Sequence, residues 1–301
     1  MDRAHEPLGP VLNARSREDA ELRAGARAPF EDPLYYTATY AAREDDASYY
    51  ASVARGRASV LELGIGNGRI ALPIAREGAE VTGIDHTRAM LDDLRARLKH
   101  EPPVVRRRVK LRQGDLRTAR VGRRFPLVIC PFNTALHLYT RQDVEAWLAR
   151  TREHLEPEGE LVFDISMPIP GDLARDPRVP YRTPPFEHPT AGRVRYWEHF
   201  DYDRVRQILF VSMFFEPMAR GEPRKAKKRT QRERGASAPG SFMTPLAHRQ
   251  FYPREMEALL HYGGFDVTEL YGDFDRGPLV QTSDVMVWHA RPRRAPRPRK
   301  A

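Results

Sequence analysis

The chain has 301 residues, of which 50 are Lys or Arg and 41 are Asp or Glu, for a formal net charge of +9. Its single cysteine, Cys130, excludes an internal disulfide, and no apolar run is long enough to cross a bilayer. The charged N-terminus lacks the apolar stretch of a signal peptide. We therefore expect a soluble, cytoplasmic protein without a membrane partner, built as one large α/β domain or two modest ones.

Two segments carry the excess positive charge. Residues 220–234 hold eight basic and two acidic residues, and residues 291–300 hold six basic and no acidic ones. The rest of the chain is slightly acidic. Such segments can bind nucleic acid through its phosphates without sequence preference. We favour the plainer interpretation, in which a basic disordered loop at 218–243 and a basic tail at 291–301 are simply solvated.

From the N-terminus, residues 1–30 mix charge with Ala, Pro and Gly and are predicted to be a loose leader. Residues 31–56 are predicted to be helical. From residue 58, apolar strands alternate with helices, which is typical of a parallel sheet covered by helices. Strands are expected at 58–63, 80–85, 107–113, 125–131 and 159–165, with helices at about 68–77, 87–99 and 141–155.

The alternation stops after residue 165. Residues 166–190 are rich in Pro and are predicted to be a loop, and the alternating aromatic residues of 193–215 predict a β-hairpin. Pro253 suits the first turn of a further helix, which Gly263 and its neighbour would end. The last expected strands, at 265–271 and 283–290, have no helix between them, as in an antiparallel pair.

The run from Val60 to Ile70 joins a short apolar strand to a helix through glycines at alternate positions, Gly64, Gly66 and Gly68. Glycine lets the backbone turn tightly and approach a ligand, and the helix that follows presents its amide groups to that ligand. An open α/β sheet holds a nucleoside-containing cofactor in this way. The dinucleotide fingerprint needs a third glycine where the chain has Arg69. An NAD site is therefore disfavoured, and a purely structural role for the loop remains an alternative interpretation.

The alternating glycines, with Glu62 two residues before the first, resemble motif I of the class I S-adenosylmethionine (SAM) methyltransferases. In that family the loop faces the methionine part of SAM, whose ammonium group an acidic neighbour can stabilise. The resemblance continues in register at Asp85, at Asp115 and at the exit of the fourth expected strand. It implies an α/β, Rossmann-like fold: a seven-stranded sheet with helices on both faces, an antiparallel last strand and a β-hairpin lid inserted after strand five.

The resemblance also implies cofactor contacts. Asp85 would accept the ribose hydroxyls, although capping a helix is an alternative role, and Met90 would touch adenine or belong to the core. Asp115 would accept the adenine amino group, and the backbone amide of Leu116 would bind a ring nitrogen. The expected SAM-binding residues are Glu62, Gly64, Gly66, Asn67, Gly68, Asp85, His86, Met90, Asp115, Leu116, Phe132 and Asn133.

The end of the fourth strand is where this family places the transferring methyl group. His137 follows it and is the candidate general base, since histidine titrates near neutral pH; packing or capping is its alternative role. The Tyr36 and Tyr40 pair weakly resembles the aromatic segment of amino-sugar N,N-dimethyltransferases and glycine-type N-methyltransferases. Arg249 could pair with an acidic acceptor, although a surface salt bridge is the simpler role. The expected acceptor contacts are Tyr36, Tyr40, Tyr196, Trp197 and Arg249.

We expect residues 31–165 to form a SAM-binding core and residues 166–251 a lid or substrate insertion. Residues 252–290 would form the C-terminal part of the core, and residues 291–301 the tail. The predicted function is SAM-dependent methyl transfer to a small molecule, mainly by positioning. The sequence Cys130-Pro-Phe-Asn133 lacks the second proline and polar first residue of nucleic-acid methyltransferases, and the scattered histidines predict no metal site. The alternatives are an RNA-associated methyltransferase, a non-catalytic SAM-binding protein and, less favoured, an NAD-linked oxidoreductase.

Overall fold

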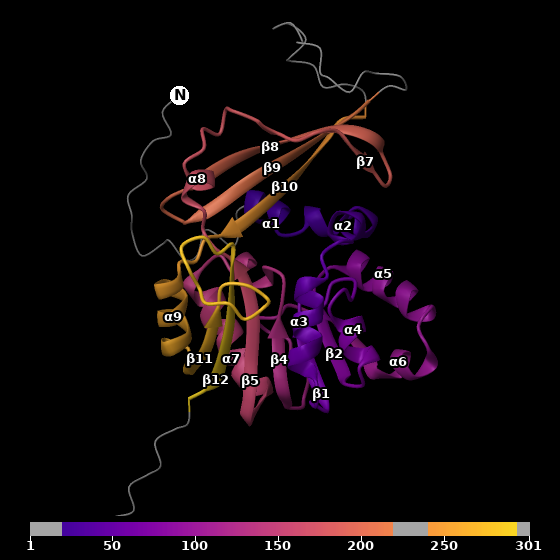
Figure 1. Ribbon diagram of the computed structural model, residues 1–301, viewed down its shortest axis with the longest axis vertical. Coiled ribbons are helices and arrows are strands. Elements are labelled where there is room, and N and C mark those ends of the chain that lie inside the picture. The colour runs from indigo at the N-terminus through magenta and orange to yellow at the C-terminus, as the bar shows by residue number, and fades with distance from the viewer. Residues whose placement is uncertain (1–19, 219–239, 294–301) are drawn as a thin grey trace, which may run out of the picture.

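The computed structural model describes residues 20–218 and 240–293, and its core is a seven-stranded sheet in the order β11-β12-β5-β4-β1-β2-β3 (Figure 1). The five strands from β1 to β5 run parallel to one another, and β12 runs antiparallel to both β5 and β11. The strands are β1 (Ser59–Leu63), β2 (Glu80–Asp85), β3 (Val109–Gln113), β4 (Phe125–Cys130), β5 (Leu155–Ser166), β11 (Phe265–Tyr271) and β12 (Val285–Pro292).

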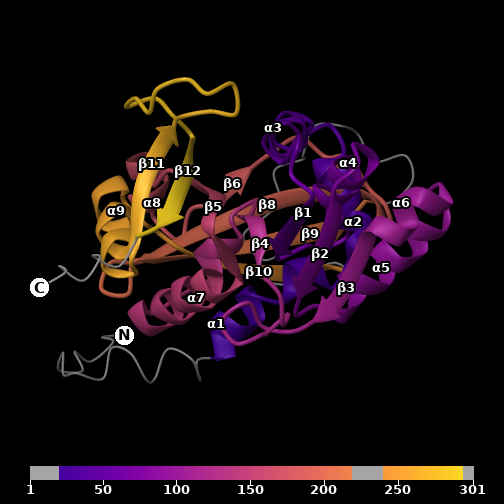
Figure 2. The ribbon, with the colours of Figure 1, turned by 90° about the horizontal axis from the view of Figure 1, so that it is seen from below.

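Helices cover both faces of this sheet, as Figure 2 shows from below. On one face, α7 (Arg141–His154) and α9 (Pro253–Tyr262) bury apolar side chains such as Trp147 and Leu260. The other face is covered by α3 (Asp45–Ala54), α4 (Ala71–Arg76), α5 (Arg88–Lys99) and α6 (Pro103–Arg108). Strands buried on both faces are apolar along most of their length, and β1 and β4 can therefore be identified from the sequence as continuous apolar runs. The predicted Rossmann-like sheet with an antiparallel last strand is confirmed.

A second, five-stranded antiparallel sheet lies between β5 and α9 in the chain. Figure 1 shows it stacked on the core, with α2 (Pro33–Tyr40) between the two. The expected hairpin is present as β8 (Gly192–Asp203) and β9 (Ile208–Pro217). The predicted loop 166–190 instead contains α8 (Pro170–Leu173) and two short strands, which are too brief to produce a periodic pattern. The remaining strands are β6 (Tyr181–Arg182), β7 (Phe186–His188) and β10 (Phe242–Arg249).

The prediction of a loose leader is wrong for residues 20–30, which form α1 (Ala20–Gly25) and the 3-10 helix η3 (Ala28–Phe30). Leu22 is 1% exposed and packs with Ile208, Phe210 and Ala247 of the second sheet. Because these contacts join residues far apart in the chain, they produce no local pattern in the sequence from which the helix could be predicted.

Further predictions need correction at the basic segments. β10 begins at Phe242, inside the predicted disordered loop 218–243, and β12 extends to Pro292, inside the predicted tail. Phe242 pairs with Phe215 of β9, and Pro292 pairs with Phe265 of β11. Residues 219–239 and 294–301 of these segments, with residues 1–19 of the leader, lie outside the described residues. None of the helices in the described ranges combines the length and the apolarity that crossing a bilayer requires.

Candidate functional site

The loop after β1 has a backbone that favours glycine. Gly64, Gly66 and Gly68 have φ angles of +79°, +52° and +83°, a region that L side chains rarely adopt. A Cβ at Gly64 would lie 2.6 Å from the side chain of Thr134, so a larger residue does not fit. The amide of Gly66 donates to Asp85 Oδ2 at 2.8 Å, which ties the loop to the end of β2.

A pocket of about 460 Å³ opens at this loop, between the carboxyl ends of β1 to β4 and the N-terminal segment from α1 to α2. Most of the expected site residues line it: Glu62, Gly64, Gly66, Asn67, Asp85, His86, Met90, Asp115, Leu116, Phe132, Tyr36 and His137. Six do not: Gly68, Asn133, Tyr40, Tyr196, Trp197 and Arg249. The lining also contains residues that sequence reasoning missed, among them Arg27, Phe30, Arg69 and Arg117.

Glu62 is the most unusual group in the pocket. It is 1% exposed, and its Oε2 has no hydrogen-bond partner in the described part of the chain. Burial raises the pKa of this carboxyl well above its usual range, although Arg69 acts in the opposite direction. A buried acidic oxygen without a partner is costly, and a cationic ligand group would satisfy it.

Asp85 holds the loop and the following helix together. Its Oδ2 accepts from Gly66, and its Oδ1 accepts from the amide of Thr87 at 2.7 Å, just before α5 begins. The two roles weighed from the sequence, ligand binding and helix capping, are therefore compatible. Each oxygen has a second lone pair, which can accept from a ligand hydroxyl.

Asp115 is already engaged by a neighbour. The Nε of Arg117 lies 2.9 and 3.0 Å from its two carboxylate oxygens, and Arg117 Nη1 donates to Asp143 Oδ1 of α7 at 2.6 Å. Burial opposes ionisation of Asp115, but these hydrogen bonds prevail and lower its pKa. Arg117 thus fixes the expected adenine-binding turn to the start of α7, where Asp143 completes a capping box with Thr140.

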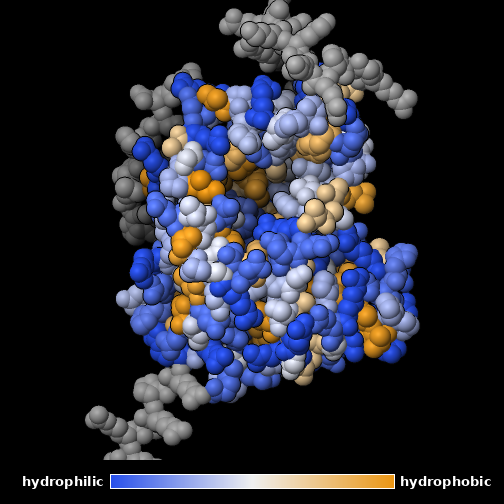
Figure 3. Space-filling model, in the orientation of Figure 1, coloured by the Kyte–Doolittle hydropathy of each residue, from blue (hydrophilic) through white to orange (hydrophobic). Residues whose placement is uncertain are grey.

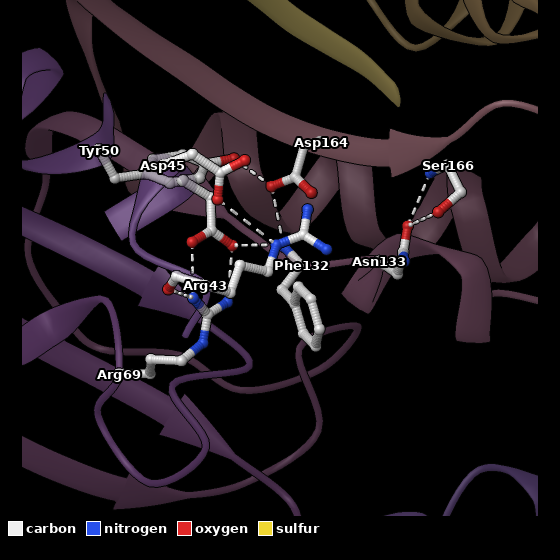
Figure 4. Close-up of polar contacts among 9 residues, drawn as sticks. Arg43, Asp45, Tyr50, Arg69, Phe132, Asn133, Asp164 and Ser166 are labelled. Atoms are coloured by element: carbon white, nitrogen blue, oxygen red, sulfur yellow. Dashed lines mark hydrogen bonds and ion pairs between the residues drawn. The ribbon is translucent and has the colours of Figure 1, made fainter. Parts of the chain in front are cut away.

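The turn after β4 is strained and is held from β5, as Figure 4 shows. Phe132 and Asn133 have φ angles of +55° and +61°, which costs about 1–3 kcal/mol for each such residue. Asp164 Oδ1 accepts from the backbone amide of Phe132 at 2.8 Å and from the hydroxyl of Tyr50 at 2.6 Å. Asn133 Oδ1 accepts from the backbone amide of Ser166 at 2.7 Å. The amide of Asn133, expected to contact a cofactor, is used to fix the turn.

Substituting Asp164 by Asn is expected to flatten the pH dependence of stability. Burial raises the pKa of Asp164 from 3.8 to about 6, against the hydrogen bonds from Tyr50 and Phe132. The folded state therefore holds this proton more tightly than the unfolded state, and the wild type loses about 3 kcal/mol as pH rises through that interval. Urea unfolding at pH values across this interval should show that the free energy of unfolding of the variant increases relative to that of the wild type as pH rises. Parallel profiles would contradict the assignment.

Arg69, which stands where a dinucleotide loop has glycine, has a structural partner. Its two terminal nitrogens lie 2.5 and 2.7 Å from the carboxylate oxygens of Asp46, a buried residue of α3. Arg43 also donates to Asp46, at 3.2 Å. The guanidinium carbons of Arg43 and Arg69 lie 4.9 and 4.6 Å from the ring centre of Phe132, so these cations help to hold the ring at the strained turn.

His137 lies in the pocket on the 3-10 helix η4 (Thr134–His137). Burial lowers its pKa well below the usual range, with His248 and His86 acting in the same direction, so it is neutral at physiological pH. Its Nδ1 lies 3.2 Å from the hydroxyl of Tyr139, which donates to the carbonyl of Ala247 at 3.0 Å. We assign the proton to Nδ1 from this network, which leaves Nε2 able to accept one.

The expected acceptor residues divide into separate groups. Tyr36 lines the pocket, and the ring of Tyr40 lies behind it, 4.9 Å from Tyr36 and 4.7 Å from Phe132. Tyr196 and Trp197 point to opposite faces of β8, as adjacent strand residues must. Tyr196 packs on Phe215, whereas Trp197 stacks on Phe214.

Arg249 forms an ion pair within the protein. Its Nη2 donates to Glu255 of α9 at 2.6 Å, which is the simpler role considered from the sequence. No group of three or more His, Cys, Asp or Glu side chains in the described ranges is arranged to hold a metal ion.

Residues 60–159 match a family model described as a methyltransferase domain. A dTDP-3-amino-3,4,6-trideoxy-α-D-glucopyranose N,N-dimethyltransferase of Streptomyces venezuelae is 32% identical over 123 residues, which cover 40% of this chain and 48% of that protein. A dTDP-3-amino-3,6-dideoxy-α-D-glucopyranose N,N-dimethyltransferase of Streptomyces fradiae is 32% identical over 107 residues, covering 36% and 39%. The chain thus matches about half the length of these curated relatives, or less.

Solved structures resemble the chain over a greater length. The CcbJ methyltransferase of Streptomyces caelestis has a TM-score of 0.68 and 23% identity, and the match covers 89% of this chain and 99% of that one. CalS10, an amino pentose methyltransferase of Micromonospora echinaspora solved with SAM bound, has a TM-score of 0.61 and 21% identity, with 85% and 96% covered. These likenesses establish the fold.

Proposed function

We propose that this chain is a class I S-adenosylmethionine-dependent methyltransferase that transfers a methyl group from SAM to an amino group of a small molecule, as the methyltransferase-domain match over residues 60–159 and the curated relatives support. The relatives' names support the choice of acceptor, since they act on amino sugars. A cytoplasmic location is part of the proposal, because a lone thiol such as that of Cys130 suits a reducing compartment.

The buried Oε2 of Glu62, which has no hydrogen-bond partner among the described residues, is the observation that carries this proposal. It lies beside the left-handed glycines in the pocket, where an ammonium group would satisfy it. SAM has such a group, and these residues fit it. Glu62 would hold the ammonium, Asp85 the ribose hydroxyls, and Asp115 with the amide of Leu116 the adenine. When bound, SAM supplies a methyl group that its positive sulfur makes strongly electrophilic.

The protein's own contribution is to position the acceptor and to remove water and a proton. The strained turn at Phe132 and Asn133, fixed by Asp164, gives the transfer site one defined wall. Leu22 and Phe30 of the N-terminal segment line the pocket, and apolar lining disfavours water at the transfer site. The neutral imidazole of His137 has an unprotonated Nε2 in the assigned tautomer, which can accept a proton that the acceptor nitrogen releases.

Asp85→Ala should weaken SAM binding more than Asp115→Ala. Asp85 holds the loop as well as the ligand, and losing a charge-assisted hydrogen bond costs about 1.5–3 kcal/mol. Asp115 has Arg117 as a partner, and removing it leaves that guanidinium free to turn toward the ligand. Titration calorimetry measures both affinities. Unchanged affinity in the two variants would show that the ribose and adenine have been assigned to the wrong strand ends.

The direct test of the function is turnover. The full chain is incubated with methyl-labelled SAM and with dTDP-3-amino-3,4,6-trideoxy-α-D-glucopyranose, the compound that names a relative, alongside other amino sugars and their deaminated counterparts. We expect label in an amine and none in the deaminated compounds. Label only in hydroxyl or carboxyl groups would refute the choice of acceptor atom.

A further inference from the structure

The second sheet presents one face to the core, and the strand alternation of β8 decides which residues lie on it. Tyr196 and Glu198 share a face, since they are two residues apart. Tyr196 pairs with Phe215 of β9, and the ring of Phe215 lies 5.3 Å from Tyr35 of α2. Because α2 lies between the sheet and the core (Figure 1), Tyr196 and Glu198 are on the core-facing side. Trp197 is on the other face.

Glu198 is a carboxylate without a cationic partner. In the described part of the chain it accepts a hydrogen bond from the hydroxyl of Tyr196 and makes no ion pair. Its situation differs from that of Glu216 and Glu255 nearby, which pair with Arg195 and Arg249. Glu198 is half-buried, so its unpaired charge is costly. A basic ligand would provide the missing counter-charge.

The surroundings of Glu198 lead to the pocket. Burial raises the pKa values of Tyr35 and Tyr40, and the negative charge of Glu198 contributes to both, so the carboxylate lies within electrostatic reach of the two phenols. The ring of Tyr40 is 4.7 Å from Phe132, which lines the pocket at the end of β4. Figure 3 shows a hollow containing apolar side chains between the second sheet and the core.

We propose that Glu198, together with the hydroxyls of Tyr196, Tyr35 and Tyr40, forms a binding site beside the pocket for a basic group of the acceptor and selects basic acceptors over neutral and acidic ones. A carboxylate and phenol hydroxyls together suit an ammonium group, the first through its charge and the second through oxygens that accept hydrogen bonds. The proposal rests on the proposed function and assigns its acceptor specificity to this group of residues. The role is binding, and the proton-accepting role stays with His137.

A binding experiment separates this inference from the proposed function. The full chain, saturated with S-adenosylhomocysteine, is titrated with D-glucosamine and with N-acetyl-D-glucosamine, which has the same ring but no basic nitrogen, and binding is followed by ligand-observed NMR. The wild type should prefer glucosamine. Glu198→Gln should bind it about tenfold more weakly, the size of one charge-assisted hydrogen bond, and lose the preference. Tyr196→Phe should reduce the preference less.

The matched control is Glu187→Gln, the same substitution on β7 of the same sheet, where the exposed Glu187 pairs loosely with Arg193 at 3.5 Å. It should keep the preference, and all variants should bind S-adenosylhomocysteine like the wild type. Wild-type protein that binds both sugars equally or binds neither, or a Glu198→Gln variant that keeps the preference, overturns the inference. Failure of the wild type to bind S-adenosylhomocysteine would instead overturn the proposed function.

Discussion

Replacing Glu62 by Met is expected to remove SAM binding while making the free protein more stable. The carboxyl is buried, and its Oε2 has no partner among the described residues, so an apolar side chain of similar size removes a desolvation cost. The same change removes the acceptor for the ammonium of SAM, and affinity should fall about 100-fold, as for a buried charge-assisted hydrogen bond. Calorimetry with SAM and thermal unfolding without it measure the two effects.

The stabilisation in Glu62→Met should increase with pH. The folded pKa of Glu62 is raised, so the folded wild type holds the proton more tightly than the unfolded chain and loses stability as pH rises above the usual range for glutamate. Glu62→Gln is the control, since it keeps the shape and removes the charge; it should also lose SAM. A Met variant that is less stable but binds SAM normally would mean that Glu62 is only a core residue.

Gly66→Val is expected to leave no measurable SAM binding in a folded protein. Gly66 has a φ of +52° and lines the pocket, so a branched side chain both strains the loop and occupies the ligand's space. Gly56 provides a matched control. Its φ is +77°, nothing lies within 4 Å of a Cβ built there, and it is outside the pocket lining.

The two valine variants separate backbone strain from ligand space. Both should lose stability by about 1–3 kcal/mol, the cost of a non-glycine residue in this region, but Gly56→Val should bind SAM like the wild type. Thermal unfolding with and without SAM reports both quantities, because a bound ligand raises the midpoint, and does so more the more tightly it binds. A Gly66→Val protein that SAM still stabilises would show that the glycine loop does not hold the cofactor.

The features that sequence could predict are those fixed by local chain geometry. Strands buried on both faces, such as β1 and β4, are continuous apolar runs, and the left-handed turns after β1 require glycine. Asp85 could be placed because it directly follows a strand that is easy to identify. The sheet order then follows from the family resemblance.

The features that sequence missed depend on partners far along the chain. Tyr50 and Asp164 are 114 residues apart, yet together they hold the turn at Phe132. Leu22 makes its segment helical by packing on β9 and β10. Arg117 engages Asp115, two residues away, and its proximity to a predicted ligand was an available signal. Trp197 illustrates a different error, because strand alternation alone separates it from Tyr196.

The most direct measurement of the central claim is transfer of labelled methyl from SAM by the full chain to a mixture of amino-sugar acceptors and, in parallel, to RNA. We expect label in a small-molecule amine, with none in the RNA and none when Gly66→Val replaces the wild type. Label in RNA alone, or a protein that binds NAD and not SAM, would contradict the account.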